Sequence, residues 1–352
     1  MKTTRKVNVG GVSVGGGAPI SVQSMLNVDT HDFEAVLAQT RALEAAGCDI
    51  VRLAVPDLDA VESVRRLKAS TVSAPIVADI HFDYKIALAC AAAGVDKIRI
   101  NPGNIGSKAK VAEVVAACKD GGIPIRIGVN GGSLRREILE KYGSPCAEAL
   151  AESALEHVRI LEEFNFEDIV VSIKSSDVRT MIGANRPLRE AFDYPLHIGV
   201  TEAGSAHIGT LKSAVGIGSL LCDGIGDTIR VSLTADPVLE VKEGKALLNA
   251  LGLGGASLID VVSCPTCGRT RIGLIDLVAE FEEKILPTLH PSKKIKVALM
   301  GCAVNGPGEA READIGIAGG EGEALLFKRG VTVGKYSEDV ILDVLRDEIN
   351  KM

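Results

Sequence analysis

Residues 98–129, IRINPGNIGSKAKVAEVVAACKDGGIPIRIGV, contain one complete unit of the pattern from which most of the chain is built. A short β-branched run at 98–101 is followed by a loop and then by a segment with helical periodicity. Ser107 can cap the start of this helix, and Gly121-Gly122 ends it before the next β-branched run at 125–129. This order of elements predicts a strand, a helix and a second, parallel strand.

The same unit recurs along the first two thirds of the chain. The expected strands are 20–25, 50–55, 76–80, 98–101, 125–129, 169–173, 198–200 and 229–233. Eight strand–helix units within about 250 residues are typical of a (β/α)8 barrel. The sequence therefore predicts an α/β protein with an N-terminal (β/α)8 TIM barrel, preceded by a short hairpin at 5–14. A doubly wound open sheet is the alternative.

A glycine-rich joint, Gly252-Leu253-Gly254-Gly255, precedes a different arrangement of elements. We expect residues 1–252 to form the barrel domain and residues 253–352 to form a small C-terminal α/β domain. The expected strands of the second domain are 258–262, 294–300, 315–318, 323–328 and 331–335, and its expected helices are 270–286 and 338–350.

Composition excludes several classes of function. The net charge of −7 and an aromatic content of 3% argue against a nucleic-acid surface, which needs basic patches and rings for stacking. No apolar run reaches the length of a membrane span, and the first residues lack the apolar core of a signal peptide. We therefore expect a cytoplasmic protein whose eight cysteines are thiols or metal ligands rather than disulfides.

Charged and polar side chains fall in or just after the expected barrel strands, where the chemistry of such barrels takes place. The cationic ones are Arg52, Arg99, Arg126, Lys174 and Arg230, and the others are Asp79, His81, Asn101, Asn130, Ser172, Glu202 and Ser232. Burying an unpaired charge is costly, and the arginine fork matches phosphate. Each arginine alone could form a salt bridge, but acidic residues at the strand ends are few. The set therefore predicts a small, multiply charged phosphorylated ligand.

Three cysteines in the C-terminal part form a metal-ligand pattern. Cys264 and Cys267 make a Cys-x-x-Cys turn, and Cys302 lies on the glycine-rich segment 301–309, in which Glu309 is the nearby candidate for a fourth ligand. The set fits either a structural zinc ion or a [4Fe–4S] cluster held by three thiolates. The second Cys-x-x-Cys that zinc ribbons usually supply is absent, so the pattern favours the cluster.

Taken together, these motifs resemble those of the GcpE (IspG) family, the 4-hydroxy-3-methylbut-2-enyl diphosphate synthases of non-mevalonate isoprenoid synthesis. The resemblance spans nearly the whole chain. It rests on segments such as Asp79-Ile80-His81-Phe82, Asn101-Pro102-Gly103-Asn104-Ile105-Gly106, Ser172-Ile173-Lys174-Ser175-Ser176, Gly226-Asp227-Thr228-Ile229-Arg230-Val231-Ser232 and both cysteine segments.

The resemblance implies a barrel joined to a cluster domain, and a substrate, 2-C-methyl-D-erythritol 2,4-cyclodiphosphate, that is opened and reductively dehydroxylated with two electrons. By motif position, it implies a [4Fe–4S] cluster on Cys264, Cys267, Cys302 and Glu309. It further implies that the cyclic diphosphate is held by Arg52, Arg99, Arg126, Lys174, Arg230, Asn101, Asn130 and Ser232, with Glu202 as the candidate acid. The implied partners are reduced ferredoxin or flavodoxin and a second copy of the chain, whose barrel each cluster domain would cap.

Two other functions remain open at this point. One is a redox-inert barrel enzyme, an aldolase or a pterin-type transferase, with a structural zinc domain. The other is a module that binds a phosphorylated metabolite without catalysis.

Overall fold

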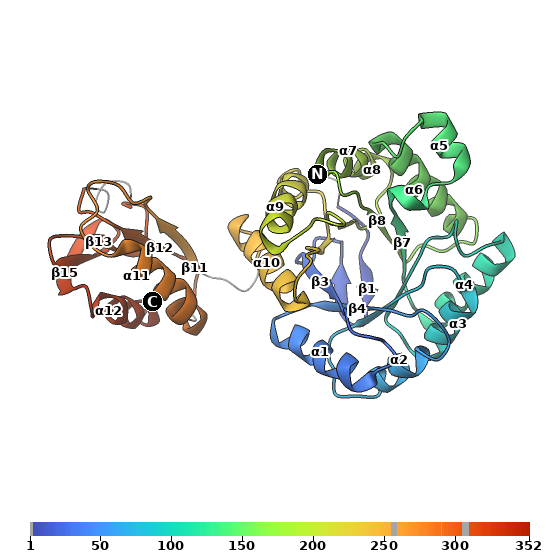
Figure 1. Ribbon diagram of the computed structural model, residues 1–352, viewed down its shortest axis with the longest axis horizontal. Coiled ribbons are helices and arrows are strands. Elements are labelled where there is room, and N and C mark those ends of the chain that lie inside the picture. Colours follow the sequence, from blue (N-terminus) through green and yellow to red (C-terminus); the bar gives the residue numbers. More distant parts are fainter. Residues whose placement is uncertain (1–2, 255–258, 290, 305–309) are drawn as a thin grey trace. The chain divides into compact units, whose positions relative to one another are not determined.

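The computed structural model describes residues 3–254, 259–289, 291–304 and 310–352. The chain divides into two compact units, Met1–Gly254 and Gly255–Met352, and each is described here by itself (Figure 1).

A closed barrel of parallel strands forms the first unit. The strands are β3 (Ser21–Met25), β4 (Ile50–Ala54), β5 (Ile76–Asp79), β6 (Lys97–Ile100), β7 (Ile125–Val129), β8 (Ile169–Ile173), β9 (His197–Ile198) and β10 (Thr228–Ile229). They pair in the order β8-β7-β6-β5-β4-β3-β10-β9, and a parallel bridge between Val171 and Leu196 joins the two ends. Each overlaps an expected strand. The predicted barrel is confirmed, and the open-sheet alternative is wrong.

Helices surround this barrel (Figure 1). They are α1 (Phe33–Ala45), α2 (Val61–Lys68), α3 (Tyr84–Ala92), α4 (Lys108–Gly121), α5 (Arg136–Tyr142), α6 (Ala147–Glu162), α7 (Val178–Asn185), α8 (Leu188–Ala191), α9 (Ala206–Cys222) and α10 (Pro237–Ala250), with a 3-10 turn at Gly131–Ser133. Side-chain caps start several of them. For example, Asp32 accepts a hydrogen bond of 3.1 Å from the backbone N–H of Ala35 at the start of α1.

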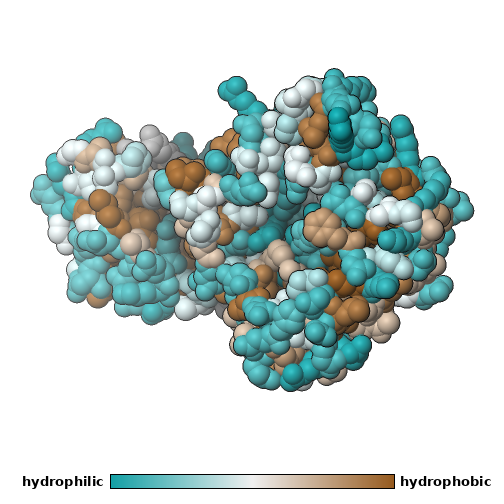
Figure 2. Space-filling model, turned by 45° about the vertical axis from the view of Figure 1, so that its right-hand side comes forward, coloured by the Kyte–Doolittle hydropathy of each residue, from teal (hydrophilic) through white to brown (hydrophobic). Residues whose placement is uncertain are grey.

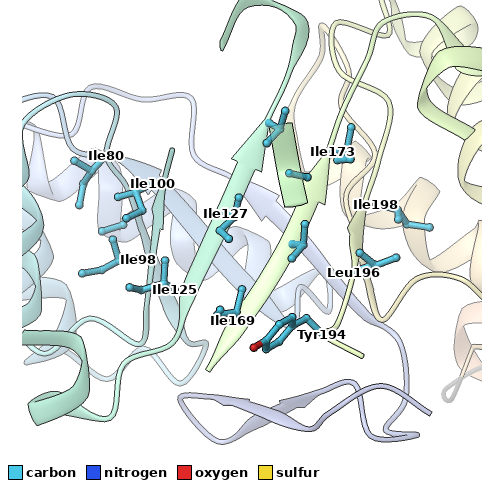
Figure 3. Packing of buried hydrophobic residues seen from close by; sticks show 14 of the residues in the cluster. Ile80, Ile98, Ile100, Ile125, Ile127, Ile169, Ile173, Tyr194, Leu196 and Ile198 are labelled. Atoms are coloured by element: carbon cyan, nitrogen blue, oxygen red, sulfur yellow. The ribbon is translucent and has the colours of Figure 1, made fainter. Parts of the chain in front are cut away.

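Strand alternation gives the barrel two different surfaces. Isoleucines of neighbouring strands, among them Ile98, Ile127 and Ile173, form the apolar layer that packs with the helices (Figure 3). The residues between them face the barrel interior. The amino-terminal end of the barrel is closed by the predicted hairpin, β1 (Val7–Val9) and β2 (Val12–Val14). Val7, Val9 and Val14 are buried against apolar residues of three barrel strands, Ile50, Val77 and Val170.

The second unit is a five-stranded sheet with helices. Its strands, in their order along the sheet, are β11 (Ile259–Ser263), β12 (Ile295–Met300), β13 (Ile315–Gly319), β14 (Glu323–Lys328) and β15 (Val331–Ser337). The first three run parallel, and the last two form antiparallel pairings. The helices are α11 (Leu274–Glu280), continued by a π-helical turn at Phe281–Ile285 and a 3-10 turn at Leu286–Thr288, and α12 (Ile341–Asn350).

The expected helix 270–286 begins later than predicted and is not α-helical throughout. The backbone N–H of Thr270 donates to Cys267 O at 3.0 Å, and that of Arg271 donates to Gly301 O at 2.8 Å. These bonds hold residues 270 and 271 in the cysteine-bearing loops, so that α11 starts only after Gly273.

No helix among the described residues is long and apolar enough to cross a membrane. On the face drawn in Figure 2, hydrophilic residues predominate and hydrophobic ones are scattered among them.

Closure of the barrel at β9 and β10 depends on a residue without a side chain. A Cβ at Gly199 would lie 2.4 Å from the backbone oxygen of Arg230, which is too close for the strands to keep their positions. We expect Gly199→Ala to lower the free energy of unfolding by about 1–3 kcal/mol, as overpacking does.

Urea unfolding followed by circular dichroism measures this loss. Gly218→Ala in α9 is the matched control, because its Cβ would meet no atom within 4 Å. Equal unfolding midpoints for the two variants would contradict the close approach at Gly199.

Candidate active site

The interior of the barrel is charged, whereas most such barrels are filled with aliphatic side chains. Arg99 on β6 lies beside Arg126 on β7 and beside Asp79 on β5 in the strand register. The charges of Arg52, Arg99 and Arg230 act on Arg126, and those of Arg230, Arg126 and Arg52 act on Lys174. The structure thus brings together the five cationic residues that the sequence placed at one site.

Asp79 organises one side of this site. Its Oδ2 lies 2.6 Å from Arg52 Nη2, and its Oδ1 lies 3.1 Å from Arg99 Nη1. Burial alone would raise the pKa of this carboxyl, but the charges of both arginines and the hydrogen bonds from His81 and Arg52 outweigh it. The pKa of Asp79 therefore lies well below its usual value, and the carboxylate stays charged.

Gly128 leaves the space that the Arg99 side chain occupies. A Cβ at Gly128 would lie 2.5 Å from Arg99 Nε and 2.8 Å from Arg99 Nη2. Since Gly128 follows Arg126 by two residues on β7, it faces the same interior. The glycine therefore allows two arginines of neighbouring strands to lie within the barrel together.

Glu240 on α10 is a site residue that the sequence reading missed. Its Oε2 lies 3.1 Å from Arg230 Nε, its Oε1 accepts from Arg230 Nη2 at 3.1 Å, and the group is almost fully buried. The expectation concerned acidic residues at the strand ends, and it did not include this partner of Arg230, which lies on a helix. The helical spacing could have indicated that Glu240 is buried, because it lies on the buried face of α10 with Pro237, Val241 and Gly244.

Two predicted cations have no ion pair within the described residues. Arg126 is buried, and its Nε and Nη1 have no hydrogen-bond partner there. Burial and the nearby charge of Arg52 lower the pKa of Arg126, yet a guanidinium stays protonated in proteins. Burial, followed by the charges of Arg230 and Arg126, also lowers the pKa of Lys174 well below its usual value. This unbalanced positive charge favours binding of an anion.

A sixth cation, Lys97, was missed because the expected strand began one residue later. It is the first residue of β6 and is completely buried, and its Nζ has no partner in the part of the chain that the structure describes. In a strand that reads Lys-Ile-Arg-Ile, Lys97 and Arg99 share one face. That two-residue spacing is the signal that could have identified it.

The uncharged candidates lie around the same interior. Ser172 is buried on β8, and Asn101 directly follows β6. Asn101 Oδ1 accepts from the backbone N–H of Gly103 at 3.0 Å, while its Nδ2 has no partner among the residues described. The backbone N–H of Asn130 donates to Ser133 Oγ at 3.0 Å. Ser232 is half-buried after β10.

Glu202 and His81 are the exposed members of the predicted set. Glu202, which follows β9, has a φ of 50°, in the left-handed region that a residue with a side chain rarely adopts. Such local strain is concentrated at functional sites. Nε2 of His81 lies 3.2 Å from Asp79 Oδ2, so His81 lies beside the arginine cluster.

In the second unit, the cysteines follow neighbouring parallel strands. Cys264 comes directly after β11, and Cys302 lies two residues after β12. The backbone N–H of Gly301 donates to Cys264 Sγ at 3.2 Å, the kind of bond that stabilises a thiolate. Hydrogen bonds from Arg269, backbone first, lower the pKa of Cys267.

A complete ligand set is not assembled in the residues that the structure describes. Within them, no three His, Cys, Asp or Glu side chains are grouped closely enough to hold a metal ion. Glu309, the predicted fourth ligand, lies outside the described residues. The three thiols therefore lie on loops at one end of one sheet without forming a closed site.

Comparison with solved structures supports the fold alone. The chain is similar to a type I 3-dehydroquinate dehydratase from Clostridium difficile, with a TM-score of 0.52 and 16% identity over 70% of this chain and 98% of that one. It is also similar to a dihydropteroate synthase from Xanthomonas albilineans, with a TM-score of 0.50 and 14% identity over 72% of this chain and 99% of that one.

Sequence comparison is far more specific. A family model described as the GcpE TIM-barrel domain matches residues 4–245, and one described as the GcpE protein C-terminal domain matches residues 260–351. Proteins named 4-hydroxy-3-methylbut-2-en-1-yl diphosphate synthase (flavodoxin) are similar over nearly their whole length. The one from Clostridium perfringens is 57% identical over 98% of this chain and 97% of its own. That from Geobacter sulfurreducens is 56% identical over 99% and 98%. The chain therefore belongs to the GcpE family.

Proposed function

We propose that this protein is a 4-hydroxy-3-methylbut-2-enyl diphosphate synthase, which opens 2-C-methyl-D-erythritol 2,4-cyclodiphosphate and removes a hydroxyl group with two electrons. Relatives bearing this name match almost the whole chain. The structural observation that carries the proposal is the positive charge inside the barrel. Arg126 and Lys174 have no carboxylate partner within the described residues, and a cyclic diphosphate supplies the missing negative charge.

Each interior residue then has a part in substrate binding. Arg126 donates to the diphosphate through its fork, and Lys174 does so as a point charge. Asp79 holds Arg52 and Arg99 by ion pairs of 2.6 and 3.1 Å, so that their remaining N–H groups are already oriented. Glu240 does the same for Arg230. The remaining donors are Asn101, Asn130, Ser172, Ser232 and His81.

Glu202 is the candidate acid in the barrel. Glu202 is exposed, has a φ of 50° and follows β9, so it lies at the end of the barrel where the strands finish. We infer that it supplies a proton to the departing hydroxyl oxygen, since a hydroxyl leaves far more easily as water.

The second unit would hold the redox group. Three thiols on the loops after β11 and β12, with a backbone N–H already aimed at one sulfur, fit a [4Fe–4S] cluster on Cys264, Cys267 and Cys302. Glu309 is the proposed fourth ligand. When bound, the cluster supplies the electrons that side chains cannot. The names of the relatives favour reduced flavodoxin as the donor, with ferredoxin as the alternative.

We infer that residues 1–252 bind substrate and residues 253–352 carry the cluster. The electrons must reach the barrel interior, so the two parts must meet during the reaction. In a homodimer, the cluster domain of one copy could cap the barrel of the other. The redox-inert alternative, a barrel enzyme with structural zinc, is not favoured, because the relatives that match almost the whole chain are named 4-hydroxy-3-methylbut-2-en-1-yl diphosphate synthase (flavodoxin).

The direct test is anaerobic turnover of the cyclic diphosphate with reduced flavodoxin. We expect the wild-type protein to be brown and to form product. The Cys302→Ser variant should lose the visible absorbance and at least about 100-fold in turnover, because losing even a hydrogen-bond partner of a metal ligand costs about 10–100-fold. Cys222→Ser, at an exposed cysteine outside the motif, is the control and should keep both. A colourless wild-type protein containing zinc would overturn the proposal.

Glu309 separates cluster binding from turnover. Glu309→Ala should retain most of the visible absorbance, since three thiolates remain, but should lose turnover. The exposed Glu312→Ala serves as the matched control. Normal turnover in Glu309→Ala would show that the reaction does not need this carboxylate as a cluster ligand.

Asp79 gives a prediction about pH. Because the pKa of Asp79 is depressed in the folded state, its contribution to stability is complete above the unfolded pKa of about 4 and is lost as the pH falls through the folded pKa. Asp79→Asn leaves buried Arg99 and largely buried Arg52 without a carboxylate partner and should cost about 3 kcal/mol at pH 7, and less below pH 4.

Urea unfolding of wild type and variant across this pH range measures the difference. Asp59→Asn, at an exposed carboxyl, is the control and should cost little at any pH. A cost for Asp79→Asn that stays constant down to the lowest accessible pH would contradict a depressed pKa.

A further inference from the structure

The deepest part of the barrel interior contains a second group of polar side chains that the proposed reaction does not use. Lys97 lies at the start of β6, beside Val77 of β5 in the strand register, and Val77 packs against the β1–β2 hairpin. Gln23, His197 and Thr228 are also completely buried. Lys97, His197 and Thr228 are the first residues of their strands, whereas Asn101 and Glu202 follow the carboxyl ends of theirs. The charge of Lys174 also acts on His197, so this group adjoins the cations described above.

These side chains lack protein partners. Among the residues described, no hydrogen bond is made by Lys97 Nζ, by either ring nitrogen of His197, by either amide atom of Gln23, or by Thr228 Oγ1. Buried polar groups in folded proteins are almost always satisfied, by protein, water or a bound species. Thr228 pairs with His197 in the strand register, and the charge of Lys97 acts on His197. Six unsatisfied atoms among neighbouring interior side chains therefore indicate an occupant.

The group can donate many hydrogen bonds, and it contains no negative charge. The Nε and Nη1 atoms of Arg126 are cationic donors. Burial, followed by the charges of Arg126 and Arg52, lowers the pKa of Lys97 well below its usual value, so its ammonium form needs an anion beside it. His197 is neutral, since burial and then the charge of Arg126 lower its pKa well below the usual value, and it offers one N–H. Asp79, the carboxylate whose charge acts on Arg126, is already bonded to Arg52 and Arg99.

We propose that a small inorganic anion of chloride size binds inside the barrel, between Lys97 Nζ and the guanidinium of Arg126, beneath the diphosphate site. Arg126 cannot lose its proton, so a negative charge is needed even when no substrate is present. A spherical anion accepts from donors in any direction, which suits an ammonium, a guanidinium, an imidazole and a hydroxyl around one point. Val7, Val9 and Val14 of the hairpin, which are buried, close the region from below.

This site shares Arg126 with the proposed diphosphate site, but its test measures anion binding and does not depend on turnover. Crystals of the full-length protein are grown in sodium bromide and, in parallel, in sodium gluconate, and anomalous scattering is measured at the bromine edge. We expect an anomalous peak in contact with Lys97 Nζ and Arg126 in bromide and none in gluconate. Absence of the peak from wild-type crystals in bromide overturns the proposal, because water beside an uncharged Lys97 would then fill the region.

Two lysine variants test whether Lys97 binds the anion. Lys97→Met keeps the length of the side chain without its charge and should abolish the peak, whereas Lys242→Met, at an exposed lysine of α10, should keep it. Replacing gluconate by chloride at constant ionic strength should raise the melting temperature of wild type by about 3 °C and leave that of Lys97→Met unchanged. An equal rise in both proteins, or a peak that survives in Lys97→Met, would show that Lys97 does not bind the anion. If Lys97→Met does not fold, the wild-type diffraction result decides alone.

Discussion

The constraint on which the site depends is the enclosure of six cations, three of them buried and three partly buried, in one barrel whose described residues pair only three of them with carboxylates. Asp79 compensates Arg52 and Arg99, and Glu240 compensates Arg230. Arg126, Lys174 and Lys97 have no such partner in the described part of the chain. Buried charges of one sign repel one another and are poorly solvated, so this interior cannot be the source of the barrel's stability.

Stability must come from the outer surface of the same strands. The isoleucines that alternate with the charged residues pack against the surrounding helices, and the hairpin valines cover the amino-terminal end. At roughly 25 cal/mol for each Å2 of apolar surface removed from water, this layer can offset an interior that is selected for binding. Alternation along one strand thus separates the two tasks, with Ile98 and Ile100 serving the fold, and Arg99 serving the ligand.

Much of this arrangement could be predicted from the sequence, because it follows from local periodicity. The β-branched runs and the glycine stops identify the strands, and the position of an arginine within a run decides that it faces inward. The exceptions have different causes. Glu240 was missed because its partner lies ten residues away, across a strand-to-helix connection, and Lys97 was missed because the strand begins one residue earlier than its apolar run. The late start of α11 was missed because backbone bonds to Cys267 and Gly301 hold the residues before it.

The excess of positive charge inside the barrel links the stability of the fold to the binding of an anion. A barrel interior with excess positive charge is least stable when empty and gains stability when an anion enters, since binding to the folded state alone shifts the unfolding equilibrium. The cyclic diphosphate would then complete the interior in the way that a hydrophobic side chain completes an ordinary barrel. Arg52, Arg99 and Arg230 are already held by carboxylates, so little reorganisation is needed when it binds. The same preorganisation keeps the charges in place as the ring opens, which is when a diphosphate gains further negative charge and the fixed cations become most favourable.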